Sequence, residues 1–325
     1  MREELERRQI GIYFAGVALG GAVGAVWAGA EGLGALLNPA IALMLFATFL
    51  QVPLADLGRG FRDGRFMAAL LVANFVAVPL LVLLLLRFGP EDPLARLGIV
   101  MVLLAPCIDY VVTFTGLGRG DARLTLAATP VLLAAQLALL PVFVALLLGG
   151  EAAKIVSAGP FLHAFVWLIA APLALAGVVQ RLARRGAAGR RAERALGLLP
   201  VPTTALVLFL VAAATTPLLG GARAQALSAV PVYLGFAVLA PALGWGVARA
   251  MRLGAGASRA VAFSAATRNS LVILPLALAA PGGFPVLPAV IVAQTLVELV
   301  AELVYIRVMP LMGRGADVTR DIGAR

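Results

Sequence analysis

Apolar runs of about 20 residues recur along the whole chain, each long enough for a helix to cross the hydrocarbon core of a bilayer, and short charged loops separate them. Hydrophobic residues make up 62% of the chain and charged residues 13%, with a mean hydropathy of +1.01. Soluble domains carry roughly 25% charged residues. The sequence therefore predicts an all-α integral membrane protein and leaves no stretch for a soluble domain.

Hydropathy, with Gly, Pro and charged residues taken as breaks, predicts ten membrane spans. They cover residues 10–29, 35–52, 66–86, 97–117, 122–148, 160–180, 198–219, 227–248, 258–280 and 285–309. Most of the 26 basic residues fall in alternate loops, whereas the opposite loops carry only Arg87, Arg96, Lys154 and Arg223. Because positively charged loops stay in the cytoplasm, we expect both termini inside a multi-pass protein of the cell membrane.

The same alternation accounts for the sequence pI of ≈ 11.2 without a nucleic-acid partner. The run RLARRGAAGRRAER at 181–194 is the densest basic stretch. We interpret it chiefly as a topology signal, and binding of anionic lipid is the alternative.

The two halves of the chain resemble each other at an offset of about half its length. Aligning Pro39 in LLNPAIALMLFATF with Pro202 in LLPVPTTALVLFLVA also places Cys107 opposite Ser270. Pro106-Cys107 and Asn269-Ser270 are the most polar interruptions in mid-span. Five spans per half is an odd number, so the second half must enter the membrane in the opposite orientation.

Paired, interrupted helices in inverted repeats are a recurring architecture of secondary transporters, with the substrate site near the bilayer midplane. We therefore predict an N-terminal five-helix repeat over 1–160 and an inverted repeat over 161–325, in one integral membrane unit. Helices 4 and 9 are expected to be broken and to cross. Their half-helix N-termini carry partial positive charge.

Four ionisable side chains are predicted at membrane depth: Asp109, Arg268, Glu298 and Glu302. A charge at the bilayer centre costs at least about 2.5 kcal/mol, so such residues usually face a cavity or a partner. An Asp109–Arg268 pair would join the two interruptions, either as a structural staple or in substrate and proton handling.

A polar stripe is predicted on the last span. Gln294, Glu298 and Glu302 are spaced by four and share one helix face. Of the two glutamates, Glu298 is expected to lie deeper, and Glu302 nearer the cytoplasmic interface. A buried carboxyl such as Glu298 can bind and release a proton, which makes it a candidate for ion coupling.

Cys107 is the only cysteine and His163 the only histidine, so an intramolecular disulfide, a Cys-rich metal site and a His-based triad are excluded. A lone cysteine is most often a small, inert core residue. Beside Pro106 at the proposed break, however, its thiol could contact a soft, thiol-seeking solute such as neutral arsenous acid. No nucleotide loop or metal cluster is present, so neither an enzyme, a cofactor nor an ATP-driven pump is expected.

These features resemble the bile acid:sodium symporter superfamily, and most closely its arsenic-resistance branch, the arsenite efflux permeases. The resemblance rests on Cys107-Ile108 followed by Gly120-Asp121, on AFSAATRNS with Asn269, and on VEL around Glu298. It implies ten spans, cytoplasmic termini and crossed half-helices in spans 4 and 9.

The chain departs from the arsenite permeases at three positions. Leu271 stands where they carry a glutamate, Arg268 replaces an asparagine, and Asp109 replaces a small residue. Arg268 falls where backbone and amide oxygens would hold a sodium ion in the bile-acid branch. The resemblance therefore favours protons over sodium as the coupling ion.

The resulting hypothesis is a secondary transporter that exports arsenite or a related metalloid in exchange for protons by alternating access. The predicted substrate-binding residues are Cys107, Asp109, Arg268, Asn269 and Ser270, and the predicted ion-coupling residues are Asp109 and Glu298. The alternative is a sodium- or proton-coupled carrier of organic anions, in which Arg268 would bind a carboxylate and Cys107 would be incidental.

Overall fold

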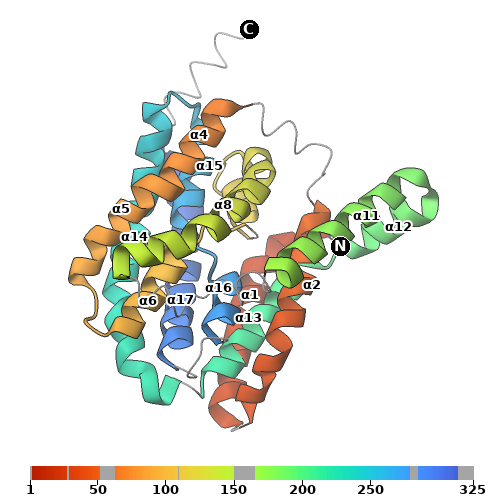
Figure 1. The fold of residues 1–325 in the computed structure, drawn as a ribbon. Coiled ribbons are helices and arrows are strands. Elements are labelled where there is room, and N and C mark those ends of the chain that lie inside the picture. Colours follow the sequence, from red (N-terminus) through yellow and green to blue (C-terminus); the bar gives the residue numbers. More distant parts are fainter. Residues whose placement is uncertain are drawn as a thin grey trace. The chain divides into compact units, whose positions relative to one another are not determined.

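The computed structural model describes residues 2–27, 29–51, 63–108, 110–149, 165–217, 219–278 and 285–313. Regular structure within these ranges is helical (Figure 1). The chain divides into two compact units, each assembled from three segments of sequence. The first unit comprises Met1–Ala55, Ile155–Ala226 and Leu271–Val292, and the second comprises Asp56–Lys154, Leu227–Ser270 and Ala293–Arg325. Each unit thus draws on both of the predicted repeats.

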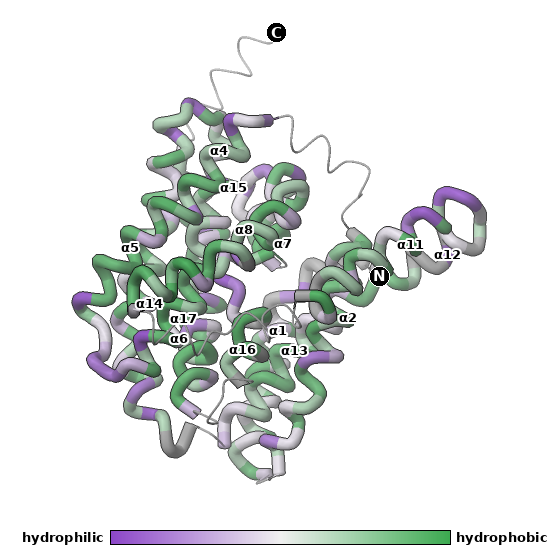
Figure 2. Tube along the Cα trace, in the orientation of Figure 1, coloured by the Kyte–Doolittle hydropathy of each residue, from purple (hydrophilic) through white to green (hydrophobic). Residues whose placement is uncertain are grey.

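The helices are mainly apolar along their length (Figure 2). In the described ranges, four are long and apolar enough to cross a membrane: Ala30–Leu50, Gly64–Phe88, Ala222–Ala250 and Val286–Leu311. A bent pair, Ala122–Gln136 and Ala138–Leu148, would make a fifth, and shorter apolar helices cover Gly11–Val26, Pro93–Leu103 and Pro200–Thr215. The chain is therefore a membrane protein with several apolar helices. The count of ten spans stays a prediction.

In the first unit, α1 (Arg2–Val26) packs against α13 (Pro200–Thr215) through glycines. A Cβ added at Gly16 would lie 2.9 Å from the carbonyl oxygen of Ala205, and one at Gly20 or Gly24 would also overlap an α13 carbonyl oxygen. Small residues spaced by four let two helix backbones approach closely. Gly16, Gly20 and Gly24 are spaced in this way along α1.

The same unit contains α2 (Leu37–Gln51), which packs on α11 (Ala171–Arg185) and α13. The buried side-chain amide of Gln180 donates to the carbonyl oxygens of Phe49 and Leu50, at 3.1 and 3.3 Å. The unit also contains η1 (Ala30–Leu36), η4 (Phe165–Ala170) and α12 (Ala187–Leu196), the last a hydrophilic stretch that follows α11 (Figure 2).

The second unit begins with a continuous apolar span made of α4 (Gly64–Val72), η2 (Ala73–Ala77) and α5 (Val78–Leu85), followed by η3 (Leu86–Phe88). Asp63 caps its start, since its carboxylate accepts from the Phe66 backbone N–H at 3.0 Å. The η2 segment is a π-helical insertion, a feature often found at functional sites. It carries the buried Asn74.

Two further aspartates begin helices in this unit. Asp92 accepts from the Ala95 N–H at 2.8 Å and opens α6 (Pro93–Leu103), with Pro93 at a first-turn position that needs no N–H. Asp121 accepts from the N–H groups of Arg123 and Leu124 and opens α8 (Ala122–Leu148). The 51° bend in α8 lies just before Pro141, which cannot bond the carbonyl four residues earlier.

The rest of the second unit consists of α7 (Val111–Leu117), most of α14 (Leu219–Ala250), α15 (Ala255–Ala266), the C-terminal part of α17 (Val286–Val308) and η5 (Met309–Leu311). Every residue of α15 from Ser258 to Ala266 is buried. A helix buried on all sides belongs to an interior rather than a surface. Whatever follows the last residue of α15 therefore begins inside the protein.

Candidate functional site

Two helical breaks meet in the interior of the second unit. One separates α6 from α7 and contains Pro106 and Cys107. The other is Thr267–Asn269, between α15 and α16 (Ser270–Leu278). Proline lacks an N–H and disfavours helical geometry at the residue before it, which explains why α6 cannot run through Pro106.

The two breaks pair with each other. Pro106 and Arg268 form an antiparallel bridge, flanked by hydrogen bonds from the Cys107 N–H to the Thr267 carbonyl at 3.1 Å and from the Asn269 N–H to the Ala105 carbonyl at 2.7 Å. Non-helical backbone at membrane depth is tolerated only where its polar groups are satisfied inside the protein. We call the stretches 104–108 and 267–269, joined in this way, the crossover.

Arg268 is fully buried, with 0% of its surface exposed. Its guanidinium donates to the Leu103 carbonyl at 3.2 Å, to Asn74 Oδ1 at 2.9 Å and to the Ser264 carbonyl. Leu103 is the last residue of α6, and Ser264 lies in the last turn of α15. Because helix C-termini carry partial negative charge, the arginine stabilises both half-helices where they stop.

Neighbouring groups fix the position of this arginine. Asn74 donates from Nδ2 to the Leu70 carbonyl and to Ser264 Oγ, both at 3.0 Å, so its Oδ1 is turned toward Arg268. The Arg268 guanidinium carbon lies 5.5 Å from the ring centroid of Phe236, a cation–π distance. Among the described residues, the hydrogen-bond partners of the guanidinium are all uncharged groups. Asp109, the partner that the sequence predicted, lies outside the described residues.

The α17 stripe is buried and faces the crossover. Glu298 accepts from the Tyr110 hydroxyl at 2.6 Å through Oε1, and from the Arg268 backbone N–H at 2.8 Å and the Gln294 amide through Oε2. The spacing by four predicted that Gln294, Glu298 and Glu302 share one helix face, and all three are buried.

Glu302 is as deeply buried as Glu298, with 0% of its surface exposed, although the sequence placed it nearer the interface. Its Oε1 lies 2.6 Å from Thr267 Oγ1. Its Oε2 has no hydrogen-bond partner among the described residues. The two glutamates of α17 thus contact consecutive residues of the second break, Thr267 and Arg268.

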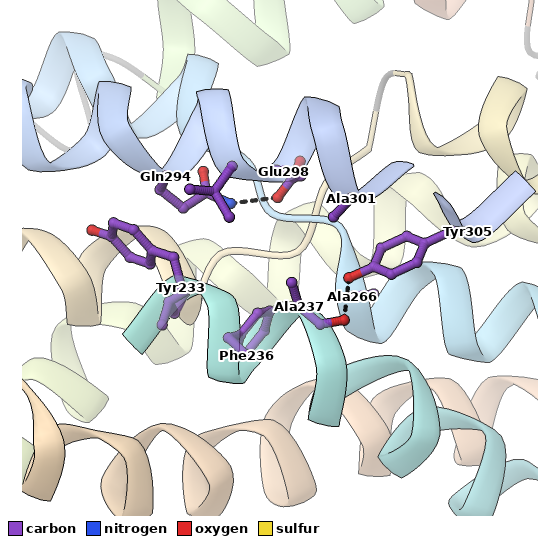
Figure 3. A pocket seen from close by; sticks show the side chains of 10 residues that line it. Tyr233, Phe236, Ala237, Ala266, Gln294, Glu298, Ala301 and Tyr305 are labelled. Atoms are coloured by element: carbon purple, nitrogen blue, oxygen red, sulfur yellow. Dashed lines mark hydrogen bonds between the residues drawn. The ribbon is translucent and has the colours of Figure 1, made fainter. Parts of the chain in front are cut away.

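A cavity with about 220 Å³ of empty space lies beside the crossover, between α14 and α17 (Figure 3). Figure 3 shows Tyr233 and Phe236 on α14 across from Gln294 and Glu298 on α17. Gln294 Oε1, which is buried, has no hydrogen-bond partner among the described residues. The enclosed room within it, about 10 Å³, is enough for about one water molecule.

The predicted site residues that the structure describes all lie at the crossover and are buried: Cys107, Arg268, Asn269, Ser270 and, from α17, Glu298. Cys107 is buried and is the only cysteine of the chain. Ser270 Oγ has no hydrogen-bond partner within the described ranges. Their roles in binding stay predictions.

Sequence analysis did not single out Asn74, Tyr110 and Thr267. Asn74 could have been noticed as an amide in the middle of the predicted span 66–86, and Tyr110 stands directly after Asp109 in APCIDY. Thr267 gave no signal, because threonine is common in helices as a group that bonds its own backbone. No group of three His, Cys, Asp or Glu side chains suited to a metal ion occurs among the described residues.

Comparison with known families gives one match. Residues 38–221, more than half of the chain, match the sequence model of the Sodium Bile acid symporter family. No curated protein matches the chain.

Proposed function

Because the chain belongs to the sodium bile acid symporter family, whose members transport small solutes and are not enzymes, we propose that it is a secondary transporter exporting arsenite or a related metalloid in exchange for protons. The observation that carries this proposal is the crossover. It brings the buried thiol of Cys107, at one helical break, against the second break, where the Arg268 backbone N–H bonds the buried carboxyl group of Glu298 on α17.

Two features support a small neutral solute. Trivalent arsenic binds thiols, and the crossover holds the only cysteine of the chain. The two terminal nitrogens of the Arg268 guanidinium already bond Leu103, Asn74 and Ser264, so an organic anion would have to compete with these bonds.

Protons are proposed as the coupling ion in preference to sodium. Sodium-coupled transport is what the family suggests in general. In this chain, however, a positive charge from Arg268 already lies against the two carbonyl oxygens and the amide oxygen at the crossover. An inorganic cation there would be repelled by that charge, whereas Glu298 can take up a proton without further ligands.

The proposal includes the architecture that alternating access requires. It assigns ten spans in two inverted repeats, 1–160 and 161–325, with both termini cytoplasmic, and the crossover at the centre of the movement. Cys107, Asp109, Arg268, Asn269 and Ser270 are proposed to line the substrate site. Asp109 and Glu298 are proposed to carry coupling protons.

Everted membrane vesicles test the function directly. An imposed pH gradient, acidic inside, should drive arsenite uptake, and Cys107→Ser should lower the rate at least about tenfold, the equivalent of 1.4 kcal/mol in one contact. Thr215→Ser, which trims one buried side chain of α13, is the matched control and should transport normally. A sodium gradient imposed without a pH gradient should have no effect.

Two results would overturn the proposal. One is that the vesicles take up an organic carboxylate but no arsenite. The other is normal arsenite uptake by Cys107→Ser. A carboxylate carrier would instead lose transport in Arg268→Gln and keep it in Cys107→Ser.

A further inference from the structure

Among the described residues, one buried basic group of the crossover and two buried acidic groups of α17 lie together. Arg268, Glu298 and Glu302 are exposed by 0%, 4% and 0%. A charge in such a place must be paired or neutralised. If both carboxyl groups were ionised, a single arginine, already turned toward uncharged oxygens, would face two negative charges one helical turn apart. The hydrogen-bond donors available around each carboxyl group indicate which of the two is neutral.

Glu298 has the surroundings of a carboxylate. An ionised carboxyl can only accept hydrogen bonds, and Glu298 accepts three, from the Tyr110 hydroxyl, the Arg268 backbone N–H and the Gln294 amide. The Tyr110 hydroxyl has another acceptor, the Arg268 carbonyl, but it is 3.4 Å away compared with 2.6 Å for Glu298. Donors therefore surround both oxygens of Glu298.

Glu302 has the surroundings of a neutral acid. Its only described partner is Thr267 Oγ1, at 2.6 Å, and that hydroxyl also lies 2.8 Å from the Phe263 carbonyl. A hydroxyl has one hydrogen to donate, and a carbonyl can only accept. If Thr267 donates to Phe263, the hydrogen between Glu302 and Thr267 must belong to Glu302. The other oxygen, Oε2, has no partner within the described residues, as expected for the carbonyl oxygen of a neutral acid rather than for half of a buried anion.

We propose that Glu302 is a proton-binding site of the crossover and carries its proton in this conformation, donating it to Thr267 Oγ1. This deepens the proposed function, on which its role in coupling rests. Release of the proton to water leaves a carboxylate that requires the Thr267 hydrogen. The hydroxyl must then turn away from Phe263, which removes a bond that closes the last turn of α15. The protonation state of Glu302 thereby sets the side-chain bond of Thr267, the C-cap residue of α15, one residue before Arg268 and two before Asn269.

The titratable and charged groups around Glu302 define the competing assignments. Glu298 and Tyr305 stand on the same helix, Arg268 belongs to the second break, and Tyr110 follows the first. Tyr305 donates to the Ala237 carbonyl at 2.5 Å, and Tyr110 donates to Glu298. Among the described residues, the hydrogen-bond partner of Glu302 is therefore Thr267. A proton shared in this cluster belongs to Glu302 or to Glu298, and substitution separates the two.

Infrared spectroscopy of the purified full chain in lipid nanodiscs, without substrate, tests the site. A neutral carboxylic acid has a C=O stretching band distinct from that of a carboxylate, and we expect this band to persist at neutral pH. Glu302→Gln should remove it, whereas Glu298→Gln should retain it. Thr267→Val should shift the band to higher frequency by removing its hydrogen-bond partner, and Thr267→Ser, which keeps the hydroxyl, should leave it in place.

Two results would overturn the proposal: no carboxylic acid band in the unmodified protein at neutral pH, or a band that is lost in Glu298→Gln and kept in Glu302→Gln. If Glu302→Gln fails to fold, the frequency of the carboxylic acid band in Thr267→Val, compared with that in Thr267→Ser, decides whether the proton belongs to Glu302. These spectra do not depend on the transported solute. Failure of arsenite uptake in vesicles therefore refutes the proposed function, while the band decides the proton site.

Discussion

Removing the contact between Asn74 and Arg268 gives a measurable test of how the crossover is held together. Asn74→Ala eliminates the 2.9 Å bond from the guanidinium and the 3.0 Å bond to Ser264 Oγ, in a fully buried place. A bond to a charged group contributes roughly 1.5–3 kcal/mol and a neutral one roughly 0.5–1.5 kcal/mol. Taken together, the free energy of unfolding should fall by about 2–4.5 kcal/mol.

A double-mutant cycle isolates the charged part of that loss. In an Arg268→Gln background the guanidinium is already gone, so Asn74→Ala should cost only the neutral part, about 0.5–1.5 kcal/mol. The coupling energy between the two positions is then about 1.5–3 kcal/mol, well above the ≈ 0.6 kcal/mol average for hydrogen bonds in one studied membrane protein. Unfolding by denaturant in detergent micelles, followed by circular dichroism, provides the four free energies.

The control is Thr215→Val in the first unit, which removes a buried hydroxyl bonded at 2.7 Å to the Val211 carbonyl. It shares no partner with Arg268, so its effect should add to that of Arg268→Gln. A coupling energy at or below about 0.6 kcal/mol for Asn74 and Arg268 would refute the claim that Asn74 fixes the buried guanidinium.

Three further predictions concern single positions. Gly20→Leu should lower the free energy of unfolding by at least about 1–3 kcal/mol, because the new side chain would overlap the α13 backbone. Gly21→Leu is the control: a Cβ added there has no neighbouring atom within 4 Å, so a thermal unfolding assay should show no change. Tyr110→Phe removes a charge-assisted bond to Glu298 and should cost about 1.5–3 kcal/mol in the same assay; an unchanged midpoint would show that the hydroxyl does not hold the carboxylate. Cys107, which is fully buried, should react with a membrane-permeant maleimide only slowly, and arsenite should slow it further. Equal labelling with and without arsenite would argue against the thiol as a ligand.

The sequence was informative about segments and about the places where helices break. The apolar runs predicted a helical membrane protein, and the glycines at Gly16, Gly20 and Gly24 lie against α13. Pro106 and the polar residues after it marked one interruption, and Asn269 marked the other. Each of these signals is local, because proline, glycine and mid-span polarity act on the residues immediately around them.

Partners far apart in sequence were not predictable in the same way. Asn74 bonds Ser264 and Arg268, 190 and 194 residues away, and nothing in an apolar span tells which neighbour an amide will meet. The burial of Glu302 was also missed, because its distance from the end of a hydrophobic run suggested the interface. Its depth depends on the packing of α17 against Thr267, a tertiary contact without a counterpart in the hydropathy pattern.

The pairing of the two breaks also imposes an order on biogenesis. The carbonyl of Ala105 is made early, and the N–H that satisfies it, on Asn269, follows only after more than half of the chain has been synthesised. Until then the break between α6 and α7 cannot be buried in lipid without leaving peptide groups that lack hydrogen-bond partners. Translation of the first half should therefore produce an insertion intermediate in which this break stays hydrated or bound to a chaperone. A truncation ending before α15 should be degraded rather than stored in the bilayer.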